Sequence, residues 1–165
     1  MLTTELVISI PGHPAPKGSL KCVGGQGGRG HVLIEDNART KDWRATIAYW
    51  VRRSWMTHMS ARGQPLGAAI TFTLPRPKGH YGTGRNRDVL KPTAPAVPVS
   101  HSTGDLDKLL RLVLDALQDT HVLPDDCQIV ELTSRKAYPL TVHQTWGDVL
   151  GYEGVVIRLY PIDET

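Results

Sequence analysis

The chain has 165 residues, a formal net charge of +3 at pH 7 and 40% hydrophobic residues, which is enough apolar content for one ordinary core. No apolar run approaches the roughly 18 residues of a membrane span, and the first residues lack the pattern of a signal peptide. We therefore expect one domain over residues 1–165, in a cytoplasmic protein with no membrane segment. The two cysteines form no C-x-x-C and the seven histidines no H-x-x-x-H, which argues against structural zinc.

The charges are distributed unevenly along the chain. Residues 1–100 hold 14 Lys and Arg against 5 Asp and Glu, whereas residues 101–165 hold 5 against 11. A basic surface attracts a polyanion, and clustered carboxylates hold hard cations. Hydrolysis of a phosphodiester needs both, because the polyanion must be attracted and its reacting phosphate neutralised.

The N-terminal part predicts a strand and a hairpin. Residues 5–10 alternate polar and apolar side chains and stop at Pro11, so we expect a strand that lies inside the sheet. Short runs at 20–23 and 31–34 flank a glycine-rich stretch and predict a hairpin. That stretch lacks the pattern G-x-x-x-x-G-K-[ST], so nucleotide binding there has little support.

A helix is predicted next, with Thr40 as its N-cap and its end near residue 59. Apolar side chains recur at helical spacing, and an amphipathic stripe of this kind usually faces a core. The stripe consists of Trp43, Ile47, Trp50, Val51 and Trp55. A second strand is predicted at residues 68–74, where Pro75 ends it.

Residues 76–104 predict a long exposed loop without apolar periodicity. They contain five Lys and Arg but only one acid, Asp88. Structureless connections longer than about 15 residues are usually functional or disordered. The charge favours a flexible arm that contacts a polyanion, and the alternative is a solvated insertion without a role.

The rest of the chain predicts a helix at residues 106–118, followed by strands at 128–135 and 155–160. One apolar stripe defines the helix, and it consists of Leu106, Leu109, Leu110, Val113, Leu114 and Leu117. The order of elements predicts an α+β fold, in which two helices pack on a mixed sheet of about four strands, with an N-terminal hairpin and a long basic loop.

Acidic residues gather at both ends of this helix. Asp105 and Asp107 begin it, and Asp126 follows its end after a short gap. Two carboxylates about 4 Å apart repel by roughly 4 kcal/mol near a protein surface, and a divalent metal relieves this. Taken alone, Asp105 and Asp107 are better explained by capping and by the field of the helix N-terminus. The combination predicts one Mg²⁺ site that all three carboxylates share.

The pattern D-L-D-x-L-x-[KR]-x-x-x-D-A-L, followed after a gap by D-D-x-Q-[IV]-V, resembles the signature of RusA-type Holliday junction resolvases. The resemblance implies a RusA-like fold and a homodimer that cuts branched DNA, the four-way junction, with Mg²⁺ or with Mn²⁺ as a substitute. It implies that Asp105, Asp107 and Asp126 are the catalytic metal ligands. The helix lysine of the family falls on Arg111, which we expect to stabilise charge on the phosphate.

Basic residues of the loop and the hairpin are expected to contact the DNA backbone without reading its sequence. These residues are Lys17, Lys21, Arg29, Arg76, Lys78, Arg85, Arg87 and Lys91.

Two alternatives stay open. One is a junction-binding protein that cuts weakly or not at all. The presence of Arg111 where the family has a lysine favours this alternative. The other is a nuclease that acts on flaps or on other branched or single-stranded DNA.

Overall fold

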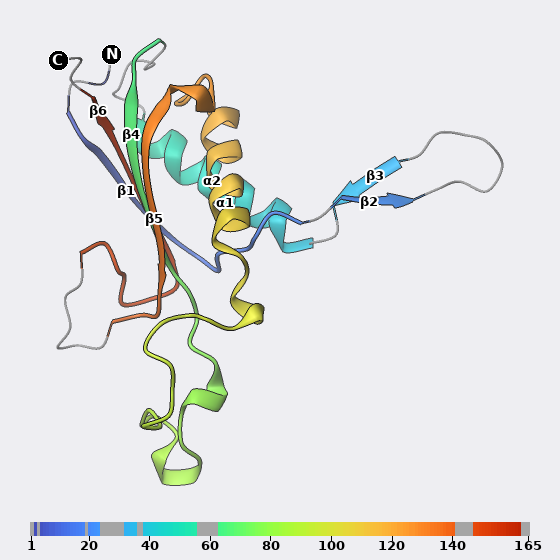
Figure 1. Ribbon diagram of the computed structural model, residues 1–165, viewed down its shortest axis with the longest axis vertical. Coiled ribbons are helices and arrows are strands. Elements are labelled where there is room, and N and C mark those ends of the chain that lie inside the picture. Colours follow the sequence, from blue (N-terminus) through green and yellow to red (C-terminus); the bar gives the residue numbers. More distant parts are fainter. Residues whose placement is uncertain are drawn as a thin grey trace.

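In the computed structural model, which describes residues 2, 4–18, 20–23, 32–35, 38–55, 63–140 and 147–162, four strands form a mixed sheet (Figure 1). The strands are β1 (Leu6–Pro11), β4 (Leu66–Thr73), β5 (Ile129–Ala137) and β6 (Gly154–Pro161), and their order across the sheet is β1-β6-β4-β5. Strand β6 pairs antiparallel with β1 and with β4, while β4 and β5 are parallel. The predicted α+β class and the four-stranded mixed sheet are confirmed.

Strand β1 lies at an edge of this sheet, so the prediction that it lies inside is wrong. It pairs with β6 alone among the described strands. Ile8 on one face is 2% exposed, whereas Val7 on the other face is 44% exposed. Alternation of this kind identifies a half-buried strand, but it says nothing about how many neighbours the strand has.

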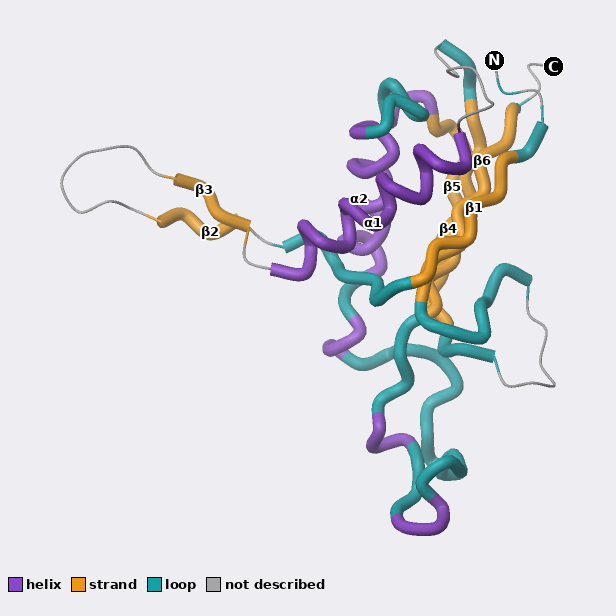
Figure 2. The backbone as a smooth tube through the Cα atoms, turned by 180° about the vertical axis from the view of Figure 1, so that it is seen from behind, coloured by secondary structure: helices purple, strands orange, loops and turns teal. Residues whose placement is uncertain are grey.

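Two helices cover one face of the sheet, α1 (Ala38–Trp55) and α2 (Leu106–Asp119), as Figures 1 and 2 show. Helix α2 lies on the crossover between the parallel strands β4 and β5, as a parallel pair requires. Helix α1 begins before Thr40, so the predicted N-cap is wrong. Thr40 is buried, and its hydroxyl donates to the carbonyl of Pro16 at 3.2 Å. Within the described ranges, no helix has the length and apolarity needed to cross a membrane.

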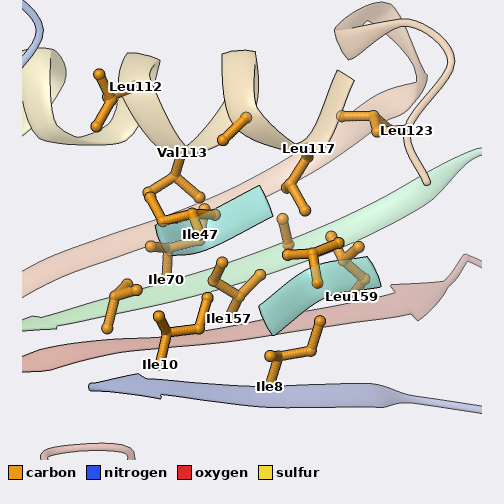
Figure 3. Packing of buried hydrophobic residues seen from close by; sticks show 14 of the residues in the cluster. Ile8, Ile10, Ile47, Ile70, Leu112, Val113, Leu117, Leu123, Ile157 and Leu159 are labelled. Carbon is orange, nitrogen blue, oxygen red and sulfur yellow. The ribbon is translucent and has the colours of Figure 1, made fainter. Parts of the chain in front are cut away.

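The core lies between these helices and the sheet (Figure 3). Leu109, Val113 and Leu117 from the predicted stripe are fully buried. Leu112 and Ala116, which the stripe omitted, are equally buried because α2 packs against α1 as well as against the sheet. Residues of the stripe that pack only at the rim of the core are Leu106, Leu110 and Leu114.

The predicted hairpin is present as β2 (Leu20–Val23) paired antiparallel with β3 (Val32–Glu35). Figure 1 shows that it projects away from the sheet and the helices. The glycine-rich stretch between its strands lies outside the described residues.

Residues 76–104, which we call the arm, project from the end of the sheet where β4 finishes (Figure 1). The arm contains three short 3₁₀ turns, Lys78–His80 (η1), Gly84–Asn86 (η2) and His101–Thr103 (η3). Backbone hydrogen bonds join its two sides, from Gly82 N to Val89 O at 2.9 Å and from Lys91 N to His80 O at 2.9 Å. The arm is therefore a folded hairpin-like projection rather than a loop without structure.

Ile157 offers a test of the packing, because it is fully buried in β6 between Ile8 of β1 and Ile70 of β4. We expect Ile157→Ala to lower the free energy of unfolding by about 2–5 kcal/mol, since it leaves a cavity in a packed core. Val99→Ala is the control, because Val99 is 71% exposed and its truncation should stay within about 0.5 kcal/mol. Urea denaturation measures both, and equal effects would contradict this core.

Candidate active site

The start of α2 presents two exposed carboxylates. Asp105 occupies the N-cap position, with φ −76° and ψ 138°, yet its side chain makes no capping hydrogen bond. It instead forms an ion pair with Lys108 at 3.1 Å, and its side chain is 53% exposed. Asp107 follows in the first turn and is exposed. Capping therefore does not account for Asp105, and both carboxylates face solvent.

Arg111 lies one turn after Asp107 and is also exposed. Helical spacing would also allow Arg111 to pair with Asp107 or Asp115, but no such ion pair is seen in the described part of the chain. Asp115 is bound instead by Lys17, at 2.6 Å, and lies 3.9 Å from Arg44. Arg111 consequently keeps its guanidinium available beside the two carboxylates at the start of α2.

Arg44 of α1 binds the carboxylate of Asp119 at the end of α2. Its guanidinium donates two hydrogen bonds to Asp119, at 2.5 and 2.8 Å. These bonds hold the pKa of Asp119 below its ordinary value. Asp115 and Asp119 thus tie α2 to α1 and to the segment after β1, which is a structural role.

Asp126 lies beyond the opposite end of α2, in the 3₁₀ turn Asp126–Gln128 (η4) that leads into β5. The neighbouring Asp125 caps this turn, because its carboxylate accepts a hydrogen bond from the backbone N–H of Cys127 at 3.0 Å. That bond lowers the pKa of Asp125. Asp126 itself is exposed. Asp125 is therefore engaged in local structure, although both carboxylates are exposed.

One chain does not bring the three predicted ligands together. The 14 residues of α2 extend for about 21 Å. The segments that carry Asp105 and Asp126 lie at its two ends (Figure 1). Among the described residues, no group of three or more His, Cys, Asp or Glu side chains is arranged to hold a metal ion. Asp105 and Asp107 form a pair, and Asp126 is remote from it within the same chain.

The cations of the arm divide into two sets. Arg76, at its base, donates to the carbonyl of Pro95 at 2.8 Å and lies 4.0 Å above the ring of Tyr138. Lys91 donates to the carbonyl of Gly79 at 2.8 Å. Lys78, Arg85 and Arg87 are exposed, and Arg87 lies 3.5 Å from Asp88. Arg76 and Lys91 thus stabilise the arm, while the other three cations face solvent.

Three of the predicted DNA contacts, Lys17, Lys21 and Arg29, precede α1 in the chain. Lys17 forms the ion pair with Asp115 given above, in a partly buried position. Arg29 lies outside the described residues, as does the side chain of Lys21. Of the three, Lys17 alone can be placed, and it is bound to α2.

Lys136 is a residue whose position the sequence did not reveal. It lies near the end of β5, and its ammonium group donates to the carbonyl of Gly104 at 2.7 Å and contacts Thr103 Oγ1 at 3.3 Å. Gly104 has φ +75°, and a Cβ there would lie 3.1 Å from Pro16. Lys136 therefore fixes the turn that presents Asp105. The pair Arg135-Lys136 was a visible signal, but nothing in it indicated this contact.

Comparison with known proteins bears on what this arrangement does. The family model described as "Endodeoxyribonuclease RusA" matches residues 11–144, which is most of the chain and includes every candidate residue named above. No curated protein gives a significant match. The family acts on branched DNA junctions. An exposed acidic pair beside an exposed arginine, with a cationic arm on the same side, is consistent with that activity, and the chain belongs to the RusA endodeoxyribonuclease family.

Proposed function

We propose that the protein cuts four-way DNA junctions as a homodimer and that Mg²⁺ supports the reaction, with Mn²⁺ as a substitute. The observation that carries the proposal is the pair Asp105 and Asp107, which the fold leaves exposed at the start of α2 with Arg111 one turn away. This pair lies in the part of the chain that the RusA family covers.

The residues at the start of α2 fit a hard cation. Mg²⁺ is usually held by one or two carboxylates together with substrate phosphates, and it keeps several waters. Asp105 forms an ion pair with Lys108, and its side chain is 53% exposed, so a cation can reach its carboxylate from solvent. Mg²⁺ held there would activate a hydrolytic water and offset the charge of the phosphate.

Arg111 acts on the same phosphate in this proposal. Its planar guanidinium suits two phosphate oxygens at once and stabilises the charge that grows on them. It cannot donate a proton to the leaving oxygen as a lysine can, because it stays charged at every accessible pH. The protein should therefore cleave more slowly than a variant with lysine there.

A second copy can complete the site. Strand β5 is an edge strand, and Val130 and Leu132 are 59% and 44% exposed on it. Two β5 strands paired antiparallel about a two-fold axis would bring the start of each beside the end of the other. The start follows Asp126, and the end carries Lys136, which holds the turn before Asp105. Each copy would then offer Asp126 to the acidic pair of the other.

A binding protein that does not cut is the rival function, and the presence of arginine at position 111 favours it. A labelled four-way junction incubated with the wild-type protein separates the two. Binding without nicks at any concentration of Mg²⁺ or Mn²⁺ would support the rival. Nicks on flaps or single strands, with four-way junctions intact, would point to a different branched substrate.

The acidic pair is tested by Asp107→Asn. We expect cleavage of the junction to fall by at least about 100-fold, because losing a ligand should cost more than losing a group that only supports one. Binding of the junction in EDTA should persist, which fluorescence anisotropy measures. Asp42→Asn is the matched control, since it removes an exposed carboxylate from α1. Unchanged cleavage by Asp107→Asn would exclude that carboxylate as a ligand.

Arg111 is tested by two substitutions at saturating enzyme, so that binding does not limit the rate. We expect Arg111→Ala to slow single-turnover cleavage by about 100-fold, since the phosphate loses a stabilising charge. Arg111→Lys should speed cleavage, by up to about 100-fold where proton donation limits the rate. Lys41→Ala on α1 controls for the loss of an exposed cation. If Arg111→Ala cleaves like the wild type, Arg111 has no part in the reaction.

The shared site is tested by mixing inactive variants. In a dimer of Asp107→Asn with Asp126→Asn, one site loses both residues and the other keeps both. With random exchange of subunits, cleavage should recover to about a quarter of the wild-type rate. A supercoiled plasmid with an extruded cruciform reports it, and nicked circles are the expected product.

The matched control is a mixture of Asp105→Asn with Asp107→Asn, which restores no complete site under either arrangement. Recovery in the first mixture but not in the second supports a site built by two copies. Failure of both mixtures would show that Asp126 acts within its own chain, whereas cleavage by Asp126→Asn alone would show that it has no role.

A further inference from the structure

A cavity of about 380 Å³ lies at the end of the sheet from which the arm projects. Its lining comes from four separate segments: the turn after β1, the first turn of α1, the residues after β4 and the 3₁₀ turn η3. Its volume falls within the range of about 300–1,000 Å³ that is usual for small-molecule sites. Nothing in the reaction described above uses this cavity.

The walls of the cavity are held in place by contacts within the protein. Arg76 is fixed by Pro95 and Tyr138, as described above. Thr103 donates its hydroxyl to the carbonyl of Ser100 at 2.6 Å and is contacted by Lys136. His13, at the opposite wall, is bound to Glu153 at 2.8 Å. Arg76, Thr103 and His13 are therefore held in position by contacts within the protein.

The cavity lies next to the acidic start of α2. Ser102 and Thr103 line it, and Asp105 follows Thr103 by two residues, a chain length of at most about 7 Å. Pro16, in the opposite wall, packs against Gly104 between them. A molecule seated against Thr103 thus lies beside the carboxylates that face the scissile phosphate.

The lining combines three chemistries. Aliphatic surfaces come from Leu74 and from four prolines, at positions 14, 16, 75 and 77. Ser102 provides an exposed hydroxyl, and the guanidinium groups of Arg39 and Arg76 provide positive charge. An unpaired base stacks between apolar side chains and hydrogen-bonds at its edge, and its phosphates bind arginine. A cavity that offers aliphatic walls, a hydroxyl and two guanidiniums matches one nucleotide.

We propose that this cavity receives one unpaired nucleotide of the DNA strand that is cut, with its base among the prolines and its phosphate towards Arg39 and Arg76. The inference rests on the proposed function, because the strand must run past Asp105. Unstacking costs least where a base is already unpaired or strained, as at a branch point. The cavity would therefore make the protein select branch points over intact duplex.

The test uses 2-aminopurine, placed in turn at each nucleotide next to the branch point of a four-way junction and bound to the full chain in EDTA. The base fluoresces when it leaves the stack, and among the described residues the cavity lining contains no Phe, Tyr or Trp to quench it. We expect a several-fold rise at one position with the wild type. Ser102→Leu, which places a larger side chain without an aromatic ring at the cavity, should abolish the rise and slow cleavage in Mg²⁺.

Ser100→Leu is the matched control. The side chains of Ser100 and Ser102 share one hydrogen bond, at 2.9 Å, and both residues are exposed, but Ser100 does not line the cavity. Both variants thus lose the same bond and gain the same aliphatic side chain, and Ser100→Leu should keep the fluorescence rise. Thermal unfolding of each variant shows whether it is folded.

A second measurement does not depend on a variant. A 4-thiothymidine at the responsive position should cross-link, on irradiation, to peptides that contain residues 13–16, 74–77 or 102–103. Cross-links elsewhere, or a rise that Ser102→Leu leaves unchanged, would overturn the inference.

Cleavage by the wild type in Mg²⁺ separates this inference from the proposed function. A junction that is cut without any change in fluorescence refutes the cavity alone. Failure to bind the junction at all refutes both.

Discussion

The apolar contact between α2 and the sheet determines where every candidate residue lies. Leu109, Leu112 and Leu117 are fully buried in it, and α2 lies on the crossover between β4 and β5. Because the helix is held along its length, its first turn stays beside the arm and its last turn stays beside the start of β5. The same contact that exposes Asp105 and Asp107 therefore keeps Asp126 away from them within one chain.

Most of the fold could be predicted from the sequence because its signals are local. The apolar period of α2 and the two short runs of the hairpin each depend on neighbours a few residues apart. The edge position of β1 and the true start of α1 depend on contacts between distant segments. Thr40 has the residue type of an N-cap, but its hydroxyl is used by Pro16 across the molecule, which no local pattern reports.

The candidate site was predictable by residue type and less so by arrangement. The acids at 105 and 107 lie in the same turn because they are two residues apart in the chain, whereas a common site with Asp126 assumed that the chain folds back over α2. Lys17 shows the same limit among the cations, since it is bound inside the protein, to Asp115. The sequence shows that a side chain is charged, but it does not show whether the side chain binds DNA or another part of the protein.

The free edge of β5 has a consequence for the isolated chain. A strand at the edge of a sheet has one unpaired side, and with exposed apolar side chains it can pair with strands of other molecules, which makes it an aggregation hazard. Two features limit that hazard here: the irregular register opposite Leu66 and Gly67, which twists the strand, and the exposed charge of Glu131 between Val130 and Leu132. The colloidal behaviour of the protein in concentrated solution should thus depend on whether this one edge is covered.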